Sequence, residues 1–471
     1  MVNLHPHRNH TWRHRAWRRV ATTASPLVLA PIGWLVANTA SACHETTVCF
    51  YWDAAWDDSN VGEDYLTSGP VQASGARVVV LRPPPETPLT SSLDTDGCIT
   101  FDTQYSYGHK ALVYADAVIG GVRLLPALDN NSQDPSSQAV PQTLFWEVDL
   151  QGLEAGGSAI GLASAEISLD QGDLHVRMLP IFAAATATMR RFEELGVMPP
   201  GLAEDETIYL AYRPVFGNAR CHCNGTSPSV VDIGVDSFRE KFVLAHELGH
   251  WLDGTWNVTG PGAFSYAYDA VDAPCQFEIA QTHDIDMNPI LSDGGGHGMR
   301  EANYGGGALV EGIAHFIAAV TWNDPAEETG IFRYYKDILL EGMDPPYQDF
   351  IDGGSLIALE GGVAADTVGG RSRWVATQCP TDWAAWTATT DVMSEMDWMR
   401  FWWRFLSDQA TAQPTLAQIL GFTAFVEGGP TPWTTTQVWP QLSSNVEAAG
   451  SPLAGFGQRF TDLADEEGVN P

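Results

Sequence analysis

One short stretch constrains the chain more than any other. Residues 243–252 read Val-Leu-Ala-His-Glu-Leu-Gly-His-Trp-Leu, and Glu247 is the only acidic or basic residue among them apart from the histidines. Four residues make about one helical turn, so a helix here places the rings of His246 and His250 on one face, where both can bind one metal ion. Glu247 lies about 100° further round the helix, where it can take a proton from a metal-bound water.

The ends of this helix are also predicted. Ser237 and Glu240 form a capping-box pattern before it, and Gly254 is expected to cap its last turn. Trp251 and Leu252 would anchor it in the interior. The alternative is that the motif arose by chance on an amphipathic helix, which a bare HExxH pattern does not exclude. A third ligand further along the chain decides between the two interpretations.

A second apolar segment carries a candidate for the third ligand. Asp253 and Trp256 stand where a metzincin has Gly and His, which excludes that class. Residues 308–320 are apolar apart from Glu311 and one histidine, and an acid in such a helix is costly to bury without a cation or a metal. Followed by Gly312, Glu311 makes this segment resemble the second helix of the gluzincin metallopeptidases, which carries their third zinc ligand.

The resemblance implies a zincin-like core in which His246, His250 and Glu311 bind Zn²⁺ and Glu247 polarises a water in the open fourth position. Two features differ from many gluzincins. The interval between the motif and Glu311 is long, about 60 residues. His315 also stands where many gluzincins have an acid oriented towards a zinc-binding histidine. We favour His315 as a residue that orients a ligand, over a competing ligand or a hydrogen-bonded core histidine.

The same resemblance implies a Tyr or His that stabilises the oxyanion of the reaction. The candidates are Tyr304, which precedes Glu311 by seven residues, and His297, which lies in the glycine-rich segment 292–298. Glycines at this density predict a mobile loop that covers the metal. For His297 the alternative is an ordinary solvated loop residue.

The N-terminus has the pattern of an export signal. Residues 1–42 contain five Arg and no acid, and the apolar run 25–37 is followed by Ala-Ser-Ala. This combination predicts a signal peptide, and the run is too short and too interrupted by proline for a transmembrane helix. Cys43 follows directly, so it is either a lipid anchor or the disulfide partner of Cys49. The protein is therefore expected to be exported, as a secreted protein or a cell-envelope lipoprotein.

Composition excludes some partners. The chain has 471 residues and a formal net charge of −34, which opposes binding to nucleic acid because the phosphates are repelled. No uninterrupted apolar segment is long enough to span a bilayer. The expected partner is a peptide or protein substrate.

The fold class expected is α+β, in several parts. Short strand-like runs between turn residues predict a small β-sandwich at 43–127. Through the strand-like run 76–80 and the Asp-Gly turn within 95–101, it resembles transthyretin-like and carboxypeptidase-regulatory modules. Such a module is either an accessory binding domain or a spacer. The further parts are a linker at 128–144, the zincin-like core at 145–345 and a mainly helical region at 346–471.

Two other patterns allow more than one interpretation. In the sequence Cys221-His222-Cys223, disulfide bonding is favoured over a second metal site because the chain is expected to be exported. Near the C-terminus, Trp, Phe and Met recur at helical spacing between 393 and 405, which favours a buried core over a sugar-binding surface.

These observations predict an exported zinc metallopeptidase. No G-x-M-E-N segment, which is usual in the aminopeptidase relatives, precedes His246, so an endopeptidase is favoured. The alternative is a surface adhesion or binding protein in which the β-module acts and the zincin-like core is only a scaffold. The intact motif argues against this alternative, because a scaffold does not need the general base Glu247.

Overall fold

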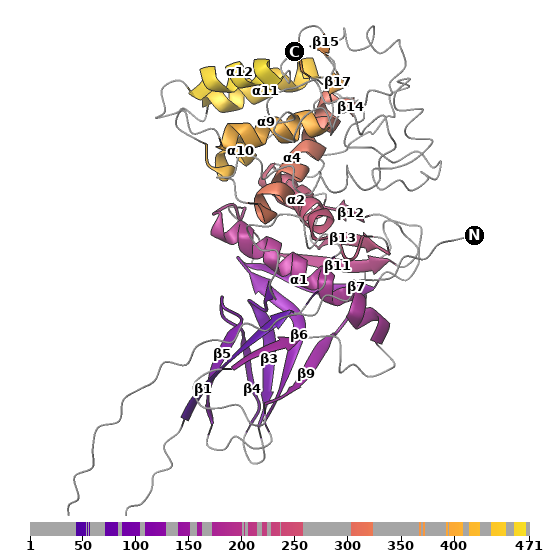
Figure 1. The fold of residues 1–471 in the computed structure, drawn as a ribbon, viewed down its shortest axis with the longest axis vertical. Helices are drawn as coiled ribbons and strands as arrows, with labels where there is room; N and C mark the ends of the chain where they lie inside the picture. The colour runs from indigo at the N-terminus through magenta and orange to yellow at the C-terminus, as the bar shows by residue number, and fades with distance from the viewer. Residues whose placement is uncertain are drawn as a thin grey trace, which may run out of the picture. The chain divides into compact units, whose positions relative to one another are not determined.

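The structure is a computed structural model of the whole chain (Figure 1). It describes residues 44–52, 54, 56, 71–82, 87–103, 109–128, 140–150, 158–162, 172–199, 202, 206–213, 219–223, 228–235, 237–257, 303–323, 367–368, 371–372, 392–393, 395–407, 414–423, 435–448 and 456–467. The predicted signal peptide and Cys43 lie outside these residues. Helices and mixed sheets both occur, which confirms the α+β class.

The larger sheet has the strand order β12-β13-β11-β7-β6-β3-β4, with β8 beside β7 and β9 beside β6. Its strands are β3 (Ala76–Leu81), β4 (Leu89–Ser92), β6 (Lys110–Ile119), β7 (Val122–Leu128), β8 (Val140–Pro141), β9 (Phe145–Asp149), β11 (Thr207–Arg213), β12 (Ala219–His222) and β13 (Ser229–Gly234). Side chains of β3 alternate between buried and half-buried, as expected for a strand with one face on the core.

This sheet continues across the predicted linker. Strand β7 pairs in parallel with β11, from Arg123 opposite Thr207 to Leu128 opposite Tyr212, and β11 pairs in parallel with β13. Strands on both sides of residues 128–144 therefore share one sheet. The division of the chain into separate domains at 43–127 and 145–345 stays a prediction. The pairing of β7 with β11 means that hydrogen bonds within one sheet connect the two parts.

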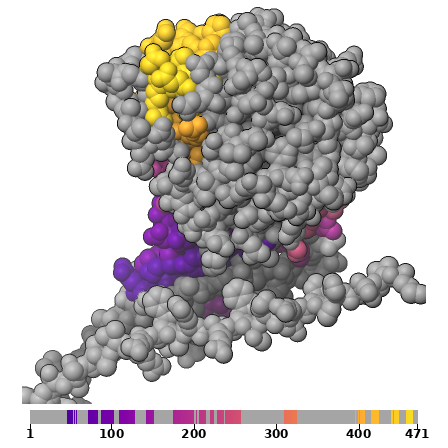
Figure 2. All heavy atoms as spheres, turned by 45° about the horizontal axis from the view of Figure 1, so that its top comes forward, coloured from indigo at the N-terminus to yellow at the C-terminus, as the bar shows by residue number. Residues whose placement is uncertain are grey.

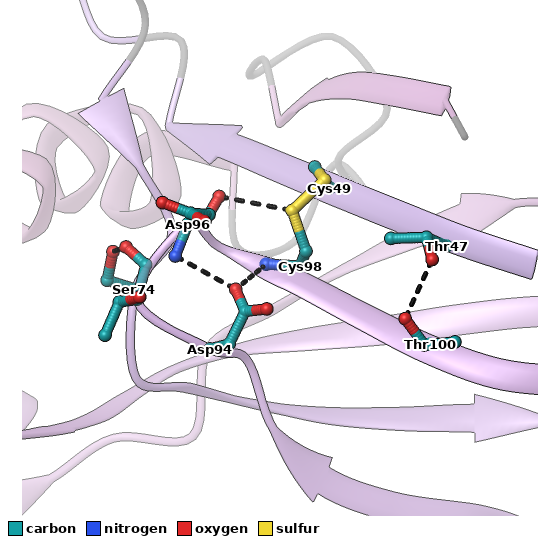
Figure 3. The surroundings of a disulfide bond; sticks show 8 residues. Thr47, Cys49, Ser74, Asp94, Asp96, Cys98 and Thr100 are labelled. Carbon is teal, nitrogen blue, oxygen red and sulfur yellow. Dashed lines mark hydrogen bonds between the residues drawn. A yellow bond between two sulfur atoms is a disulfide. The ribbon is translucent and has the colours of Figure 1, made fainter. Parts of the chain in front are cut away.

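A smaller sheet contains β1 (His44–Trp52), β2 (Val71–Gln72), β5 (Cys98–Thr103) and β10 (Ser158–Leu162). Strands β1 and β5 are antiparallel, and a disulfide joins Cys49 to Cys98 directly across them (Figure 3). The alternative that Cys49 pairs with Cys43 is therefore wrong. The register of the two strands places the cysteines opposite each other, so the disulfide adds a covalent link between strands that are already hydrogen-bonded.

The predicted Asp-Gly turn leads into β5 (Figure 3). One carboxylate oxygen of Asp94 accepts hydrogen bonds from the backbone N–H groups of Asp96 and Cys98, at 2.9 and 2.7 Å. Gly97 has a φ of +72°, and a Cβ there would lie 2.7 Å from the carbonyl oxygen of Phe50. Only glycine suits both the backbone conformation and the close approach to β1.

The helices within the described residues are α1 (Gly172–Glu194), α2 (Lys241–Asn257), α4 (Gly305–Trp322), α9 (Glu395–Ser407), α10 (Leu416–Phe422), α11 (Thr435–Ala448) and α12 (Phe456–Glu467). Helix α2 packs against α1 and α4, and α4 in turn packs against α9 (Figure 1). None of the described helices combines the length and hydropathy that a membrane span requires. Two short ribbons, β14 (Asn303–Tyr304) with β17 (Val392–Met393) and β15 (Thr367–Val368) with β16 (Arg371–Ser372), complete the described elements.

The aromatic residues of α9 form part of the core. Trp398, Phe401, Trp402 and Phe405 are fully buried, and Phe460 of α12 packs edge-on against Phe401 and Phe405. The helical spacing thus marks a packed interior, as predicted, and these side chains are not available to bind sugars. In the space-filling view, C-terminal helices (yellow) and N-terminal strands (indigo to violet) reach the surface on the face shown (Figure 2).

An ion-pair cluster links three neighbouring strands of the larger sheet. The largely buried carboxylate of Asp116 on β6 accepts hydrogen bonds from Arg123 on β7, at 2.8 and 2.9 Å, and from Arg77 on β3, at 2.9 Å. Burial alone would raise the pKa of Asp116. The hydrogen bonds and positive charges of Arg123 and Arg77 outweigh burial and hold its pKa below the ordinary value of 3.8.

We expect Asp116→Asn to lower the free energy of unfolding by about 1–2 kcal/mol at pH 7, since both arginines then lose a charged acceptor. The folded-state pKa is the lower one, so the stabilisation is complete above pH 3.8 and is lost as the pH falls through the folded-state value. Denaturant unfolding of both proteins at pH 7 and near pH 3 measures this. A difference that does not shrink on acidification would contradict the assignment.

Candidate metal centre

Helix α2 follows β13, which lies next to the edge strand β12 in the larger sheet. Strand β13 ends at Gly234, and after a short turn α2 begins at Lys241. The helix is held on several sides by fully or almost fully buried side chains: Phe242, Leu244, Ala245, Leu248, Trp251 and Leu252. Lys241 itself is buried, with its ammonium group 5.0 Å from the centre of the Trp322 ring at the end of α4. The predicted anchoring by Trp251 and Leu252 is confirmed.

The predicted caps of α2 are wrong. Ser237 lies in the turn before the helix, where its carbonyl oxygen accepts a hydrogen bond from the N–H of Glu240, so the helix starts later than the pattern indicates. Gly254 lies inside the helix, which continues to Asn257. A Cβ at Gly254 would lie 3.3 Å from the carbonyl oxygen of Cys223, so this glycine allows the chain after β12 to lie against α2.

Another glycine brings α2 and α4 together. Gly249 belongs to the His-Glu-Leu-Gly-His motif, and a Cβ there would lie 3.1 Å from both the Cα and the carbonyl oxygen of Ala314. Without a side chain at this position, the two backbones can approach closely. The approach places Glu311 of α4 opposite the histidines of α2, although the two segments are far apart in the sequence.

The three predicted ligands meet. Nε2 of His246 and Nε2 of His250 are 3.0 Å apart, and Oε2 of Glu311 lies 3.1 Å from the first and 3.0 Å from the second. Ligand atoms held about 2.0–2.1 Å from one tetrahedral Zn²⁺ lie about 3.3 Å from each other. The observed triangle is within a few tenths of an ångström of this requirement. His246, His250 and Glu311 therefore form a group that can hold a metal ion.

The electrostatics of the triangle also favour a cation. Burial, together with the neighbouring His315 and His250, lowers the pKa of His246 to about 3, although Glu311 acts in the opposite direction. At neutral pH its ring is therefore unprotonated, the form in which imidazole binds a metal. The Glu311 carboxylate is almost fully buried. Two imidazole nitrogens and a buried carboxylate oxygen converge on one point, where a metal ion can accept a lone pair from each.

Glu247 on α2 and His315 on α4 are two further polar residues that the sequence assigned to this centre. Glu247 is buried and lies on α2 next to His246 in the sequence. The His315 ring packs against the His246 ring, with centroids 4.1 Å apart, and Nε2 of His315 lies 3.3 Å from Oε2 of Glu395. His315 thus lies beside a ligand, as favoured from the sequence, and does not belong to the group of three.

Glu395 is the residue of this region that the sequence analysis missed. It is the first residue of α9 and is fully buried, although it is charged and stands in a segment otherwise rich in Trp, Phe and Met. Because α9 also carries Asp397, Arg400 and Arg404, an acid at position 395 does not stand out in the sequence as Glu311 does in its apolar segment.

The other predicted residues are only partly described. Tyr304 lies in β14, opposite Val392 of β17, and its side chain is not described. His297 and the glycine-rich segment around it lie outside the described residues. The roles of both in stabilising an oxyanion stay predictions.

The Cys221-His222-Cys223 sequence forms no metal site within the described part of the chain. A disulfide joins Cys221 to Cys223, as favoured from the sequence. Nε2 of His222 lies 2.8 Å from Oδ2 of the buried Asp232, which also pairs with Arg213 and Arg220. This cluster ties β12 to β13 and β11, so its role in these strands is structural.

Comparison with known proteins adds no family. No protein-family model matches the chain, and no curated protein matches it. Among solved structures, it is similar to part of a 9R-lipoxygenase from Cyanothece, with 9% sequence identity over 35% of this chain and 25% of that chain and a TM-score of 0.14. A similarity this low carries no argument about fold or chemistry, so the function is inferred from the metal centre itself.

Proposed function

We propose that this protein is an exported, zinc-dependent endopeptidase with a gluzincin-type centre in a zincin-like core. The proposal rests mainly on one observation, the triangle of His246, His250 and Glu311 with separations of 3.0–3.1 Å between its ligand atoms. The donor set of two imidazole nitrogens and one carboxylate oxygen is the set of catalytic zinc sites that keep a fourth position open.

In the proposed reaction, three residues bind the metal and a fourth transfers protons. His246, His250 and Glu311 would hold the zinc, which when bound would supply Lewis-acid polarisation of the scissile carbonyl and the attacking water. Glu247 accepts a proton from that water and delivers it to the leaving amine nitrogen. The same carboxylate thus acts first as general base and then as general acid. Its position beside a ligand and its burial support this role.

Export is supported by the disulfide between Cys49 and Cys98. Disulfides between structural cysteines persist in oxidising compartments and are rare in the cytosol. The basic and apolar N-terminal segment provides the matching signal, with Cys43 as either a lipid anchor or an unmodified residue after cleavage.

Digestion of a denatured protein with acetylated N-termini tests the proposal. We expect internal cleavage that a chelator abolishes and that added Zn²⁺ restores, because the site is empty after chelation and competent after reloading. Release of internal fragments from blocked chains distinguishes an endopeptidase from an aminopeptidase. A protein that binds zinc stoichiometrically but cleaves no such substrate would contradict the proposal and favour an adhesion protein with a zincin-like scaffold.

A further inference from the structure

A buried acid on a third helix adjoins the metal centre. Glu395 has no exposed surface, and its Oε2 lies 3.3 Å from Nε2 of His315, whose side chain is also largely buried. With Glu395 as a carboxylate, which can only accept, the tautomer of His315 with its proton on Nε2 donates this hydrogen bond. Glu395 is the first residue of α9, and the N-terminus of a helix favours a negative charge.

Helix α9 approaches α4 through a glycine, as α2 does. A Cβ at Gly312 would lie 2.5 Å from Cβ of Trp398 and 2.7 Å from the carbonyl oxygen of Glu395. Any side chain at 312 would push the helices apart and separate Glu395 from His315. Because Gly312 has no side chain, α9 can lie close enough to α4 for Glu395 to reach His315.

His315 connects this acid to a metal ligand. Its ring lies against the ring of His246, with a centroid distance of 4.1 Å and planes inclined by 42°. A ligating histidine is usually oriented by a hydrogen bond from its second ring nitrogen. Within the described part of the chain, Nδ1 of His246 is buried and has no hydrogen-bond partner. The ring of His315 is therefore a contact that can orient His246.

We propose that Glu395 is a positioning residue of the metal centre. By accepting the hydrogen bond of His315 it fixes the plane of that ring, and the ring contact holds His246 with Nε2 directed at the metal. The contact runs from α9 through α4 to α2, so the C-terminal helices take part in metal affinity. This inference rests on the metal site of the proposed function, but not on peptide hydrolysis.

Zinc affinity of the full-length protein, measured by competition with a chromogenic chelator, tests the inference. We expect Glu395→Met, which keeps the length of the side chain and removes the acceptor, to weaken zinc binding about 10- to 100-fold, the usual effect of losing a partner of a ligand. His315→Phe, which keeps a ring but no donor, should weaken it similarly. The double variant should lose no more than either single variant, because both interrupt one contact chain.

A matched control separates positioning from stability. Asp116→Asn also removes a buried, ion-paired carboxylate, but on the sheet, and should leave zinc affinity unchanged. The visible spectrum of the Co²⁺-substituted protein gives a second readout, which should change in Glu395→Met and His315→Phe and not in Asp116→Asn. If Glu395→Met does not fold, His315→Phe alone decides.

The possible failures can be distinguished. Zinc affinity and Co²⁺ spectrum unchanged in both variants would overturn the positioning role and leave the peptidase proposal intact. A wild-type protein that binds zinc but hydrolyses no peptide would overturn only the peptidase proposal. A wild-type protein that binds no zinc would overturn the metal site and the positioning role together.

Discussion

Glu247→Gln is expected to lower the rate of peptide hydrolysis by about 10²- to 10⁴-fold, the usual contribution of a positioned general base. The amide keeps the size of the carboxylate and cannot accept the proton of the attacking water. Since Glu247 is not one of the ligands, zinc content should stay at the wild-type level. Parallel measurements of zinc content and of kcat/KM separate the two effects.

Glu194→Gln is the matched control for this variant. Glu194 is a half-exposed acid at the end of α1, paired only with arginines of its own helix in the ion pairs seen. Its replacement should change neither zinc content nor activity. Glu247→Gln with undiminished activity would remove Glu247 from the reaction, whereas loss of zinc together with activity would mean that Glu247 supports the metal and not the proton transfer.

Glu311→Gln is expected to weaken zinc binding by more than about 100-fold, because loss of a direct ligand should exceed the effect of losing a partner of one. Zinc stabilises the folded protein by an amount that grows with the logarithm of its concentration divided by the Kd, about 2.7 kcal/mol when the concentration is 100 times the Kd. Thermal unfolding with and without Zn²⁺ should therefore show a rise in Tm for the wild type and almost none for the variant.

The metal-free proteins provide the control for Glu311→Gln. Without zinc, the wild type keeps a buried carboxylate beside two imidazole rings, of which His246 is neutral at pH 7, and the variant replaces the carboxylate with a neutral amide. The metal-free variant should thus be at least as stable as the metal-free wild type. A variant that is less stable without metal but responds normally to Zn²⁺ would show that Glu311 serves packing and not coordination.

The parts of this site that follow local spacing could be predicted from sequence. The histidines lie one turn apart on α2, so their convergence depends on helix geometry alone. Glu311 could be predicted because a buried acid in an apolar helix needs a partner, and the resemblance to gluzincins supplied one. Its distance from the histidines depends on the close approach at Gly249, which no local pattern reveals.

Features that depend on tertiary contact were not predictable. Glu395 lies 80 residues beyond His315 in the sequence, and no spacing rule links the two. The caps of α2 were wrong because Ser237 belongs to a separate turn and because Gly254 serves a contact with Cys223 instead of ending the helix. The parallel pairing of β7 with β11 also joins strands that are distant in sequence. Alternation within each strand indicates its buried face but not its neighbour.

X-ray absorption at the zinc edge of the full chain, loaded with one zinc per molecule, tests the metal centre most directly. Coordination by His246, His250 and Glu311 predicts a first shell of nitrogen and oxygen atoms at about 2.0–2.1 Å, with the scattering pattern of two imidazole rings. A first shell that contains sulfur at about 2.3 Å would place the zinc at cysteines instead and would contradict the account.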